Sequence, residues 1–468
     1  MSRISVESLK SLIQDVRPAE DLPAYLAIAN GIRSLVLSGQ LPIGAQLPSE
    51  RASAEALGIS RTTASAAYRE LRASGLITTS QGRRAVLQIP RGGMADFMPL
   101  PQEDETIDLA TGAPMPHSEL LESLYRKAAG MLPAFFSRTS LPAYGLSELR
   151  RLVAQRFTDR GLPTQEEQIL VTAGAQDALR RVLEVESRRG DSVLVEQPTY
   201  PQATNLVTRT GRVPVSMPID PRREGVGWNS EDITARYELV RPTCHYTIPD
   251  GHNPTGLVMS DEARQSLASA AEAQETVLLI DETTTELTSY PDRPRPRPLA
   301  SYLRNHRLGI TIGSLSKIYW PGLRVGWVRA CPEVIASLTM SQSSDETSCS
   351  IMDQLTAIQV FTNMEKVREI RSAQLRRSRA AAVQALADFL PDAVCTPGDG
   401  FTLWVRLGES LAPALCAAAK GMGVRVRPGS YFGFDQSFSD CLRIPLVQPP
   451  EVLSEGISRL GEVYARLS

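Results

Sequence analysis

The sequence predicts two folded units: a small helical domain ending in two short strands, and a large α/β domain built on a mainly parallel sheet. Three observations lead to this prediction. Near the N-terminus, two short helical patterns flank a Gly-containing turn, and a polar connector follows them near residue 100. Beyond it, strand-like apolar runs alternate with longer helical patterns. At 468 residues, the chain is long enough for a small domain joined to one enzyme-sized body.

The composition is that of an ordinary globular protein, with 42% hydrophobic residues, 22% charged residues and a net charge of -2. Any affinity for nucleic acid must therefore come from a local basic patch. Six scattered cysteines form no C-x-x-C pair and do not cluster with the four histidines, which favours reduced thiols over a zinc site. We expect a cytoplasmic protein with no membrane contact, because no signal-peptide pattern or long uncharged apolar run occurs.

Capping residues predict the helices of the small domain. Apolar residues recur at helical spacing over 26–36. Ser49 can cap a second helix, which ends at Gly58, a residue suited to left-handed backbone. Ser60 can then cap a third helix over 61–73. Two short helices joined by such a tight turn form a helix-turn-helix.

A wing and a basic surplus accompany this motif. The strand-like runs 76–79 and 85–88 flank a turn containing Gly82. Between residues 21 and 90 seven arginines stand against four acids. The N-terminus of the third helix can meet phosphates and base edges in a major groove, although an arginine on a helix is more often a solvated surface residue. The predicted DNA contacts are Ser49, Arg51, Ser60, Arg61, Thr62, Thr63, Arg83 and Arg84.

A longer match makes the DNA-binding interpretation specific. The strings L-P-S-E-R at 47–51, L-G-I-S-R-T-T at 57–63 and L-R-A-S-G-L-I at 71–77 resemble the GntR-type winged-helix domain. The resemblance extends over about seventy residues in the right order. It implies that double-stranded DNA is a partner.

The large domain follows a connector, residues 91–106, that has several prolines, glycines and acids but little apolar periodicity. Strand-like runs and helical patterns then alternate, which predicts a mainly parallel sheet with ligand groups at the strand ends. The expected strands are 169–172, 192–195, 244–248, 277–280 and 309–312. The expected units are an N-terminal extension at 1–20, the winged helix-turn-helix domain at 21–90, the connector at 91–106 and the large domain at 107–468.

The residues around Lys317 give the clearest indication of the chemistry of the large domain. A lysine amine can form an imine with an aldehyde cofactor. The neighbouring Ser314, Ser316 and Arg324 could hold a phosphate by hydrogen bonds and charge. A surface lysine in a Ser-rich loop is the commoner case in general. Here S-L-S-K followed by P-G-L-R-V-G resembles the lysine segment of fold-type I pyridoxal-phosphate enzymes.

Polar residues at the other strand ends supply partners for such a cofactor. Gly174, Ala175 and Gln176 open a helix directly after a strand, where backbone N–H groups can hold a phosphate. Tyr200 could stack on the pyridine ring or simply pack, and Asn253 could donate to the phenolic oxygen or belong to an ordinary Asn-Pro turn.

A carboxylate at the end of the fourth of these strands completes this set. Asp281 could pair with the pyridinium nitrogen, because a carboxylate at the end of a buried strand needs a partner, or it could cap a helix.

In order, A-G-A-Q, P-T-Y-P, H-N-P-T-G, I-D-E and S-L-S-K resemble the aminotransferase class I/II set over most of 107–468, which implies a fold-type I aminotransferase-like domain. Within this resemblance, Arg443 of the C-L-R-I segment corresponds to an arginine that grips an amino acid's carboxylate. Gly112 corresponds to the glycine that lets the backbone approach the same group.

A GntR-type domain joined to an aminotransferase-like domain resembles the MocR arrangement of bacterial transcriptional regulators. The resemblance implies pyridoxal 5'-phosphate (PLP) held by Lys317, a head-to-tail homodimer, and DNA affinity that changes when an amine or amino acid forms an external aldimine. Two alternatives stay open: an active PLP-dependent aminotransferase with an attached DNA-binding domain, and a regulator that has lost its cofactor.

Two differences from that family pattern favour ligand sensing over catalytic turnover. Thr283 stands where many MocR-like proteins have a tyrosine, so a phenol that would hydrogen-bond the cofactor is missing. Ala175 replaces a frequent serine and removes one phosphate donor. The Arg-Pro run at 293–298 is more often an extended solvated loop than a DNA contact.

Overall fold

The computed structural model describes residues 4, 6, 9–10, 24–37, 41, 45–73, 76–78, 84–88, 106–137, 142–221, 227–292, 295–341, 349–434 and 437–467. Most of the predicted N-terminal extension, the connector up to residue 105 and Arg83 of the wing lie outside these residues. None of the helices in the described ranges has the length and apolar character needed to cross a membrane.

The small domain contains the predicted helix-turn-helix and wing, which confirms this part of the fold. Its elements are α2 (Ala24–Leu37), α3 (Glu50–Leu57), α4 (Arg61–Ala73), β1 (Ile77–Thr78) and β2 (Val86–Leu87), the two strands being antiparallel. Ser49 caps α3 by accepting from Ala52 N at 3.2 Å. Gly58 ends the helix with φ +65°, and Ser60 accepts from Thr63 N at 3.0 Å. Both cap predictions are therefore correct.

The small domain has a hydrophobic core of its own. Ile32, Leu71 and Leu76 are fully buried in it. Tyr68 joins α4 to the start of α3, because its hydroxyl donates to Pro48 O at 2.8 Å and lies 2.8 Å from Ser53 Oγ. This buried contact fixes the angle between the two helices that would meet DNA.

The large domain is built on a seven-stranded sheet in the order β4-β10-β9-β8-β7-β5-β6. All pairs are parallel except the two made by β10, so the predicted mainly parallel sheet is confirmed. Its central strands are buried along their whole length, as expected when helices cover both faces. The strands are β4 (Ile169–Thr172), β5 (Ser192–Gln197), β6 (Val213–Pro218), β7 (Cys244–Thr247), β8 (Val277–Asp281), β9 (Gly309–Ser314) and β10 (Gly326–Arg329).

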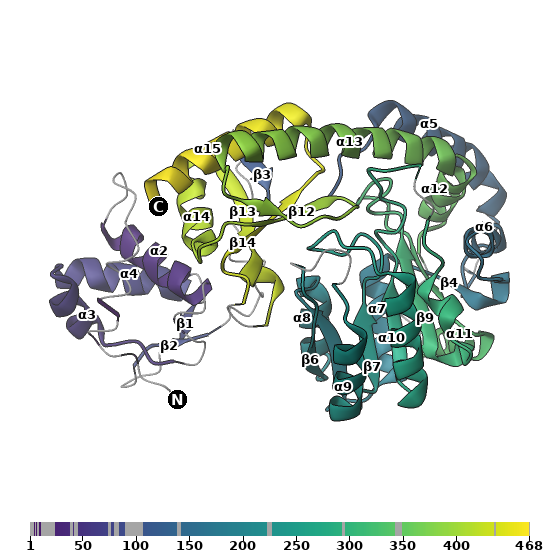
Figure 1. Ribbon diagram of the computed structural model, residues 1–468, viewed down its shortest axis with the longest axis horizontal. Coiled ribbons are helices and arrows are strands. Elements are labelled where there is room, and N and C mark those ends of the chain that lie inside the picture. Colours follow the sequence, from purple (N-terminus) through teal and green to yellow (C-terminus); the bar gives the residue numbers. More distant parts are fainter. Residues whose placement is uncertain are drawn as a thin grey trace.

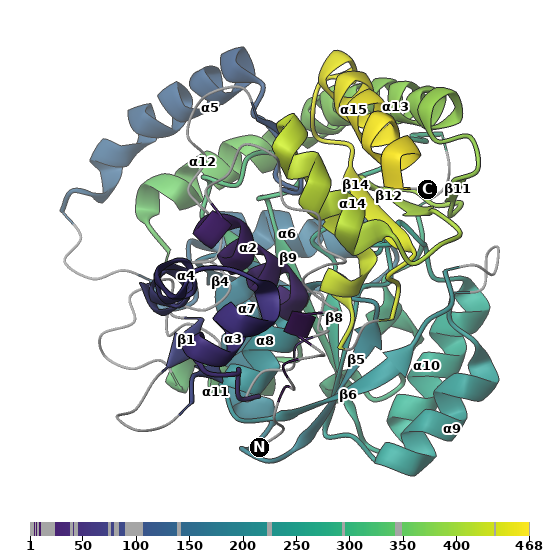
Figure 2. The same ribbon diagram turned by 90° about the vertical axis from the view of Figure 1, so that its left-hand side faces the viewer.

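Helices surround this sheet, as Figures 1 and 2 show from two sides. Their apolar faces and the strands together form one continuous core. The α-helices are α5 (Ser118–Met131), α6 (Ser147–Asp159), α7 (Ala175–Glu186), α8 (Pro201–Arg209), α9 (Ser230–Val240), α10 (Asp261–Ala273), α11 (Pro332–Met340) and α12 (Ile351–Thr362). Short 3-10 helices lie at Leu132–Phe135, Glu166–Gln168, Leu299–Tyr302 and His306–Leu308.

A second sheet, in the order β11-β12-β14-β13-β3, belongs to the C-terminal part of the chain. Its strands are β11 (Val394–Cys395), β12 (Thr402–Arg406), β13 (Val424–Pro428), β14 (Cys441–Pro445) and β3 (Ile107–Leu109). The long helix α13 (Met364–Phe389), which runs along the top of Figure 1, packs with α15 (Pro450–Leu467). The remaining helices are α14 (Ala412–Ala419) and the 3-10 turns Lys420–Met422 and Gly429–Phe432.

Strand β3 is the exception to the order of the chain. It directly follows the connector, yet it pairs in parallel with β13, with Ile107 opposite Val424. As a result, the residues after β3 pass close to β14 and to Arg443. The fold thereby brings Gly112 into the candidate site.

Candidate functional site

Lys317 lies in the turn after β9, and its side chain is half-buried. Its Nζ donates to Gly112 O at 2.7 Å and lies 5.5 Å from the centre of the Phe401 ring. Burial, and then the positive charge of Arg443, lower the pKa of Lys317 to about 8, although Asp281 opposes this shift. A larger fraction of this amine is therefore unprotonated and nucleophilic near neutral pH than for an ordinary lysine.

This pKa predicts how the uptake of an aldehyde cofactor depends on pH. Because the neutral amine is the reactive form, the rate at which cofactor-free protein takes up PLP should rise as pH increases through about 8 and level off above it. At pH 7.5 about a quarter of the Lys317 amines would be neutral, against about one in a thousand for an unshifted lysine. Stopped-flow absorbance measures this rate, and a rate that kept rising up to pH 10 would contradict the shifted pKa.

Asp281 ends β8, next to the strand that leads to Lys317. Its Oδ2 accepts from the buried Tyr246 hydroxyl at 2.6 Å, and its Oδ1 accepts from Thr283 N at 2.9 Å. A turn follows rather than a helix, so Asp281 is not a helix N-cap. Burial, and then the charge of Asp281, raise the pKa of Tyr246 well above its usual value, so Tyr246 stays a hydrogen-bond donor to an acceptor carboxylate.

Asn253 follows β7 and is buried, and its Oδ1 has no hydrogen-bond partner among the residues that the structure describes. An unsatisfied amide in a buried site is costly unless a ligand or water completes it. The preceding His252 is fixed, with Nδ1 2.8 Å from Thr255 Oγ1 and Nε2 3.2 Å from Glu196 Oε2. The buried Asn253 side chain could therefore contact a bound ligand.

Gly174 caps the N-terminus of α7 with φ +101°, a conformation that favours glycine. A Cβ atom there would lie 3.2 Å from Nη2 of Arg324. The same Nη2 donates to Ala173 O at 3.0 Å, so the guanidinium lies over the first turn of α7, where Ala175 and Gln176 begin the helix. A helix N-terminus beside an exposed arginine is suited to a phosphate.

The two serines near Lys317 differ in the hydrogen bonds that their hydroxyl groups form. Ser314 Oγ donates to Val325 O at 2.8 Å and accepts from Ser316 N at 3.2 Å. It therefore shapes the turn that carries Lys317. Ser316 Oγ lies 2.8 Å from Ser314 Oγ and is half-buried at the surface of this turn.

Tyr200 caps α8 and is half-buried. Burial raises its pKa to about 12, and the negative charge of Asp281 adds to this effect, whereas a hydrogen bond with Gln176 opposes it. The phenol therefore stays neutral and lies near both the carboxylate at the end of β8 and the start of α7.

Arg443, on β14, is buried and has its guanidinium 5.1 Å from the centre of the Phe432 ring. Its Nη2 donates to Ala110 O, and its Nε is buried and has no hydrogen-bond partner within the described part of the chain. A Cβ on Gly112 would lie 2.6 Å from Phe401 Cε2 and 3.0 Å from Arg443 Nη1, so only glycine fits. Burial, and then the neighbouring Arg427, lower the pKa of Arg443 to about 10, still well above neutrality.

These residues fit a PLP molecule in their chemistry. The buried side chain of Asn253 could donate through its Nδ2 to the phenolic oxygen of PLP. The backbone at Gly174 beside Arg324 suits the phosphate, and the buried carboxylate of Asp281 suits the ring nitrogen. The amine of Lys317 suits its aldehyde.

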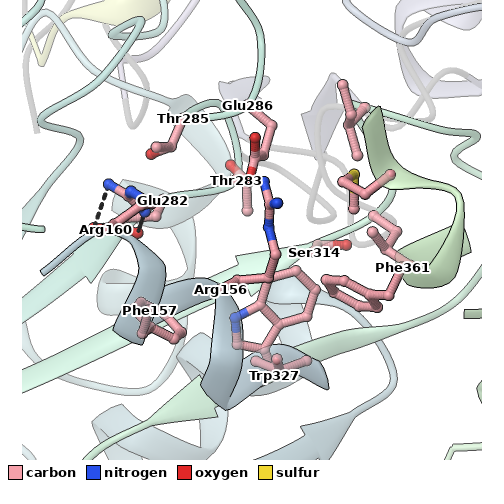
Figure 3. Close-up of a pocket in the computed structure, with 14 residues that line it drawn as sticks. Arg156, Phe157, Arg160, Glu282, Thr283, Thr285, Glu286, Ser314, Trp327 and Phe361 are labelled. Carbon is pink, nitrogen blue, oxygen red and sulfur yellow. Dashed lines mark hydrogen bonds and ion pairs between the residues drawn. The ribbon is translucent and has the colours of Figure 1, made fainter. Parts of the chain in front are cut away.

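A separate pocket, whose lining is shown in Figure 3, includes residues on both sides of Lys317 in the sequence. Ser314, Leu315 and Ile318 form one wall of it. Arg156 reaches across the pocket to Glu286 at 2.5 Å, above the ring of Trp327. The polar wall is completed by Glu282, which pairs with Arg160 at 2.6 Å, by Thr283 and by Thr285. Thr283, at the position where the phenol is missing, therefore faces this pocket.

Three residues near the site were missed by sequence reasoning. Tyr246 hydrogen-bonds Asp281, and Phe401 packs on Gly112 and Lys317. Arg371 of α13 donates to carbonyls on both sides of the site. Tyr246 had a signal, since it lies in an apolar strand beside the one that ends at Asp281. Phe401 and Arg371 had none, because their contacts depend on the packing of distant segments.

The predicted DNA contacts gather at the start of α3 and α4. Arg51, Arg61 and Thr62 are exposed, Thr63 is half-buried, and Arg84 is exposed at the wing. The hydroxyls of Ser49 and Ser60 serve as helix caps. In the Arg-Pro run, Arg295 pairs with Glu286 at 2.9 Å. This half-buried arginine is anchored to the large domain, so the interpretation of the run as a solvated loop is wrong there.

Comparisons with known proteins agree with this architecture. Residues 105–460 match the family of aminotransferase class I and II, and residues 24–87 match bacterial regulatory proteins of the gntR family. LysN, an α-aminoadipate aminotransferase from Thermus thermophilus solved with N-(5'-phosphopyridoxyl)-L-leucine, superposes with a TM-score of 0.70 at 26% identity. That match covers 78% of this chain and 93% of LysN.

Full-length relatives carry regulatory names. YdfD of Bacillus subtilis, named an uncharacterized HTH-type transcriptional regulator, is 27% identical over 484 residues, covering 96% of this chain and 97% of YdfD. The probable rhizopine catabolism regulatory protein MocR of Rhizobium meliloti is 25% identical over 486 residues, covering 96% and 95%. The chain thus belongs to the aminotransferase class I and II family and carries at its N-terminus a helix-turn-helix domain of the gntR family of bacterial regulatory proteins.

Proposed function

We propose that the protein is a DNA-binding transcriptional regulator whose large domain holds PLP and senses a primary amine. Among primary amines, an amino acid fits the site best. One observation carries the proposal. The amine of Lys317 and the buried guanidinium of Arg443 meet on either side of Gly112, in a chain that also has a gntR-family domain. A group that binds amines next to a group that binds carboxylates suits an amino acid as ligand.

PLP, when bound, would supply an aldehyde carbon that can form a C=N bond with an amine, and Lys317 would hold it through its own amine. The protein's own residues would hold it in place: Asp281 would keep the ring nitrogen protonated, and Asn253 would donate to the phenolic oxygen. Arg324 and the N-terminus of α7 would hold the phosphate. Tyr246 supports this arrangement, because its hydroxyl keeps the Asp281 carboxylate in place.

The ligand can change DNA affinity only if it prefers one arrangement of the protein over another. Arg443 lies on the C-terminal sheet, whereas Lys317 and Asp281 lie at the end of the seven-stranded sheet. An amino acid that contacts both would favour the arrangement in which the two sheets lie closest. We infer that this preference is the signal passed to the helix-turn-helix domain.

A second candidate function is PLP-dependent amino transfer, because Lys317, Asp281, Asn253 and Arg443 are all present. Against it stands Thr283, which cannot hydrogen-bond or titrate as a tyrosine does. Turnover of an amino donor with a keto acid, measured on purified PLP-loaded protein and lost in Lys317→Ala, would favour catalysis over sensing.

The proposal includes a homodimer acting in the cytoplasm on two DNA half-sites. Two-fold symmetry would match the helix-turn-helix domains to a palindromic operator.

DNA binding tests the regulatory half of the proposal. Arg61→Ala should weaken binding to a fragment from the protein's own upstream region about tenfold, and should reduce the slope of log K against log salt by about 1, because one phosphate contact is lost. Fluorescence anisotropy at several salt concentrations measures both. Arg377→Ala, an exposed arginine on α13, is the matched control. If the unchanged chain bound no DNA at low salt, the regulator proposal would have to be abandoned.

A further inference from the structure

Arg371 of α13 is a buried cation with which no carboxylate pairs in the part of the chain that the structure describes. The residue is 6% exposed. Burial lowers the pKa of its guanidinium to about 10, which leaves it charged at neutral pH. Such a charge is stable only when hydrogen-bond acceptors replace the water it has lost. The acceptors around Arg371 therefore indicate what it does.

Four hydrogen bonds surround this guanidinium. Its Nε donates to Ile318 O at 3.2 Å, and its Nη2 donates to Tyr319 O at 3.0 Å and to Met115 O at 3.2 Å. Its Nη1 donates to Gln374 Oε1 at 2.5 Å. A guanidinium carries its N–H groups in one rigid plane, so its acceptors are fixed relative to one another. The three carbonyls belong to two segments that are far apart in the sequence.

The first of these segments is the turn that carries Lys317. Ser314 Oγ fixes the start of this turn by donating to Val325 O at 2.8 Å. Arg371 fixes its end, because the two carbonyls that it contacts there directly follow the lysine. The backbone of Lys317 is therefore held from both sides.

The second segment is the one that passes through Gly112. Met115 comes three residues after this glycine, and Pro114 between them restricts the backbone. The hydrogen bond to Met115 O therefore limits where Gly112 can lie. Since Lys317 Nζ donates to Gly112 O at 2.7 Å, Arg371 positions the segments of both partners in this hydrogen bond.

Gln374 connects Arg371 to a third segment. The two side chains lie three residues apart on α13, a spacing that places them on one face of the helix. While its Oε1 accepts from Arg371, the Nε2 of Gln374 donates to Val447 O at 3.3 Å. Val447 follows β14, four residues after Arg443. The pair on α13 therefore reaches the segment of the carboxylate-binding group as well.

The three segments meet with no room between them. One narrow gap is lined in part by Pro114, Lys317, Arg371, Gln374 and Val447, and no water molecule fits in it. Water therefore cannot replace the guanidinium as the donor to these carbonyls while the packing stays as it is. The observed arrangement depends on the side chains of α13.

We propose that Arg371, together with Gln374, is a positioning residue of the site. It sets the spacing between the Lys317 amine, the Gly112 carbonyl and the Arg443 guanidinium. The use of this spacing, to bind the amine and the carboxylate of one ligand, rests on the proposed function. The positioning of Lys317 does not, because every contact that produces it lies within the chain.

Acetic anhydride tests the positioning of Lys317 on the cofactor-free full chain, because it acetylates only the neutral form of an amine. Mass spectrometry of the peptide that contains Lys317 gives the pH midpoint of acetylation, which should lie near 8 in the unchanged chain. Arg371→Met should raise this midpoint by about one pH unit, because a loosened turn lets water reach the amine. The charged groups that act on the amine, Arg443 and Asp281, are unchanged in this variant.

Internal and external controls accompany this measurement. Lys127 and Lys366 are exposed and serve as reference amines in every sample. Arg377→Met changes an exposed arginine on α13 and should leave the Lys317 midpoint near 8. A folded Arg371→Met protein whose midpoint also stayed near 8 would overturn the proposal, because a residue that only stabilises the fold lowers the melting temperature without altering this amine.

Arg371→Lys separates position from charge. It keeps the positive charge but loses the planar fork, so it should still raise the Lys317 midpoint by at least about half a pH unit. A midpoint that moved in Arg371→Met but not in Arg371→Lys would assign the effect to charge, and would overturn the positioning role.

Gln374→Leu tests the connection to β14 and keeps the proposal testable if the Arg371 variants fold poorly. In the PLP-loaded full chain it should weaken the binding of L-alanine about fivefold. Methylamine, which has no carboxylate, should bind as before, because only the contact with Val447 is lost. Titration of cofactor absorbance measures both affinities.

Equal effects of Gln374→Leu on the two ligands, or no effect on either, would overturn the role of this pair. An unchanged chain whose absorbance did not respond to methylamine would instead contradict the proposed function. In that case the acetylation midpoints still decide whether Arg371 positions Lys317.

Discussion

Lys317→Ala is expected to abolish both the retention of PLP through gel filtration and the response of DNA affinity to amines. The reason is that Lys317 provides the amine of the site, with a pKa of about 8 that favours bond formation near neutral pH. DNA affinity without ligand should stay within about twofold, because the helix-turn-helix domain has its own core. Absorbance after gel filtration and fluorescence anisotropy with and without amine measure the two effects.

Lys366→Ala is the matched control for this variant, since Lys366 is an exposed lysine on α13. It should leave PLP retention and DNA response unchanged. A Lys317→Ala protein whose DNA affinity still changed with amines would show that the signal does not pass through this lysine, and would remove the basis of the sensing proposal.

Arg443→Leu should weaken the binding of L-alanine to the PLP-loaded protein at least about 100-fold, while methylamine binds as before. Removing one partner of a buried charge pair costs about 3 kcal/mol, which corresponds to that factor. The loss is selective, because Arg443 offers its unpartnered Nε to a carboxylate. Titration of cofactor absorbance with each ligand measures the two affinities.

Two controls make the Arg443 result interpretable. Arg377→Leu changes an exposed arginine on α13 and should affect neither ligand. Methylamine binding reports whether the Arg443→Leu site remains intact, and Arg443→Gln keeps a hydrogen-bond donor if the leucine variant folds poorly. Equal losses for alanine and methylamine would mean that Arg443 holds the fold rather than a carboxylate.

Local signals made the helices and strands around the site predictable. Ser49, Gly58 and Ser60 mark the ends of α3 and α4 because capping is decided by neighbouring residues. The strand expected at 169–172 was placed at its observed bounds, and the helix expected to open at Gly174–Gln176 does begin there. The order of strand-end residues likewise indicated that the groups around Lys317 would share one edge of a parallel sheet.

Long-range packing made the rest unpredictable. Nothing in the sequence near Ile107 indicates that β3 pairs with a strand, β13, that lies more than 300 positions later. The hydrogen bond from Arg371 to Met115 O depends on this placement of β3. The hydrogen bond from Arg443 to Ala110 O depends on it as well. Backbone carbonyls carry no sequence signature, so contacts made through them appear only in three dimensions.

The placement of β3 also has a consequence for synthesis on the ribosome. The DNA-binding domain emerges first and has a complete core, so it can fold while most of the chain is still unmade. Strand β3 must wait for β13, because Ile107 pairs with Val424. A nascent or truncated chain would therefore contain a folded DNA-binding domain without the proposed ligand site. On the proposed function, the DNA affinity of such a chain would not respond to an amine, whereas that of the full-length protein would.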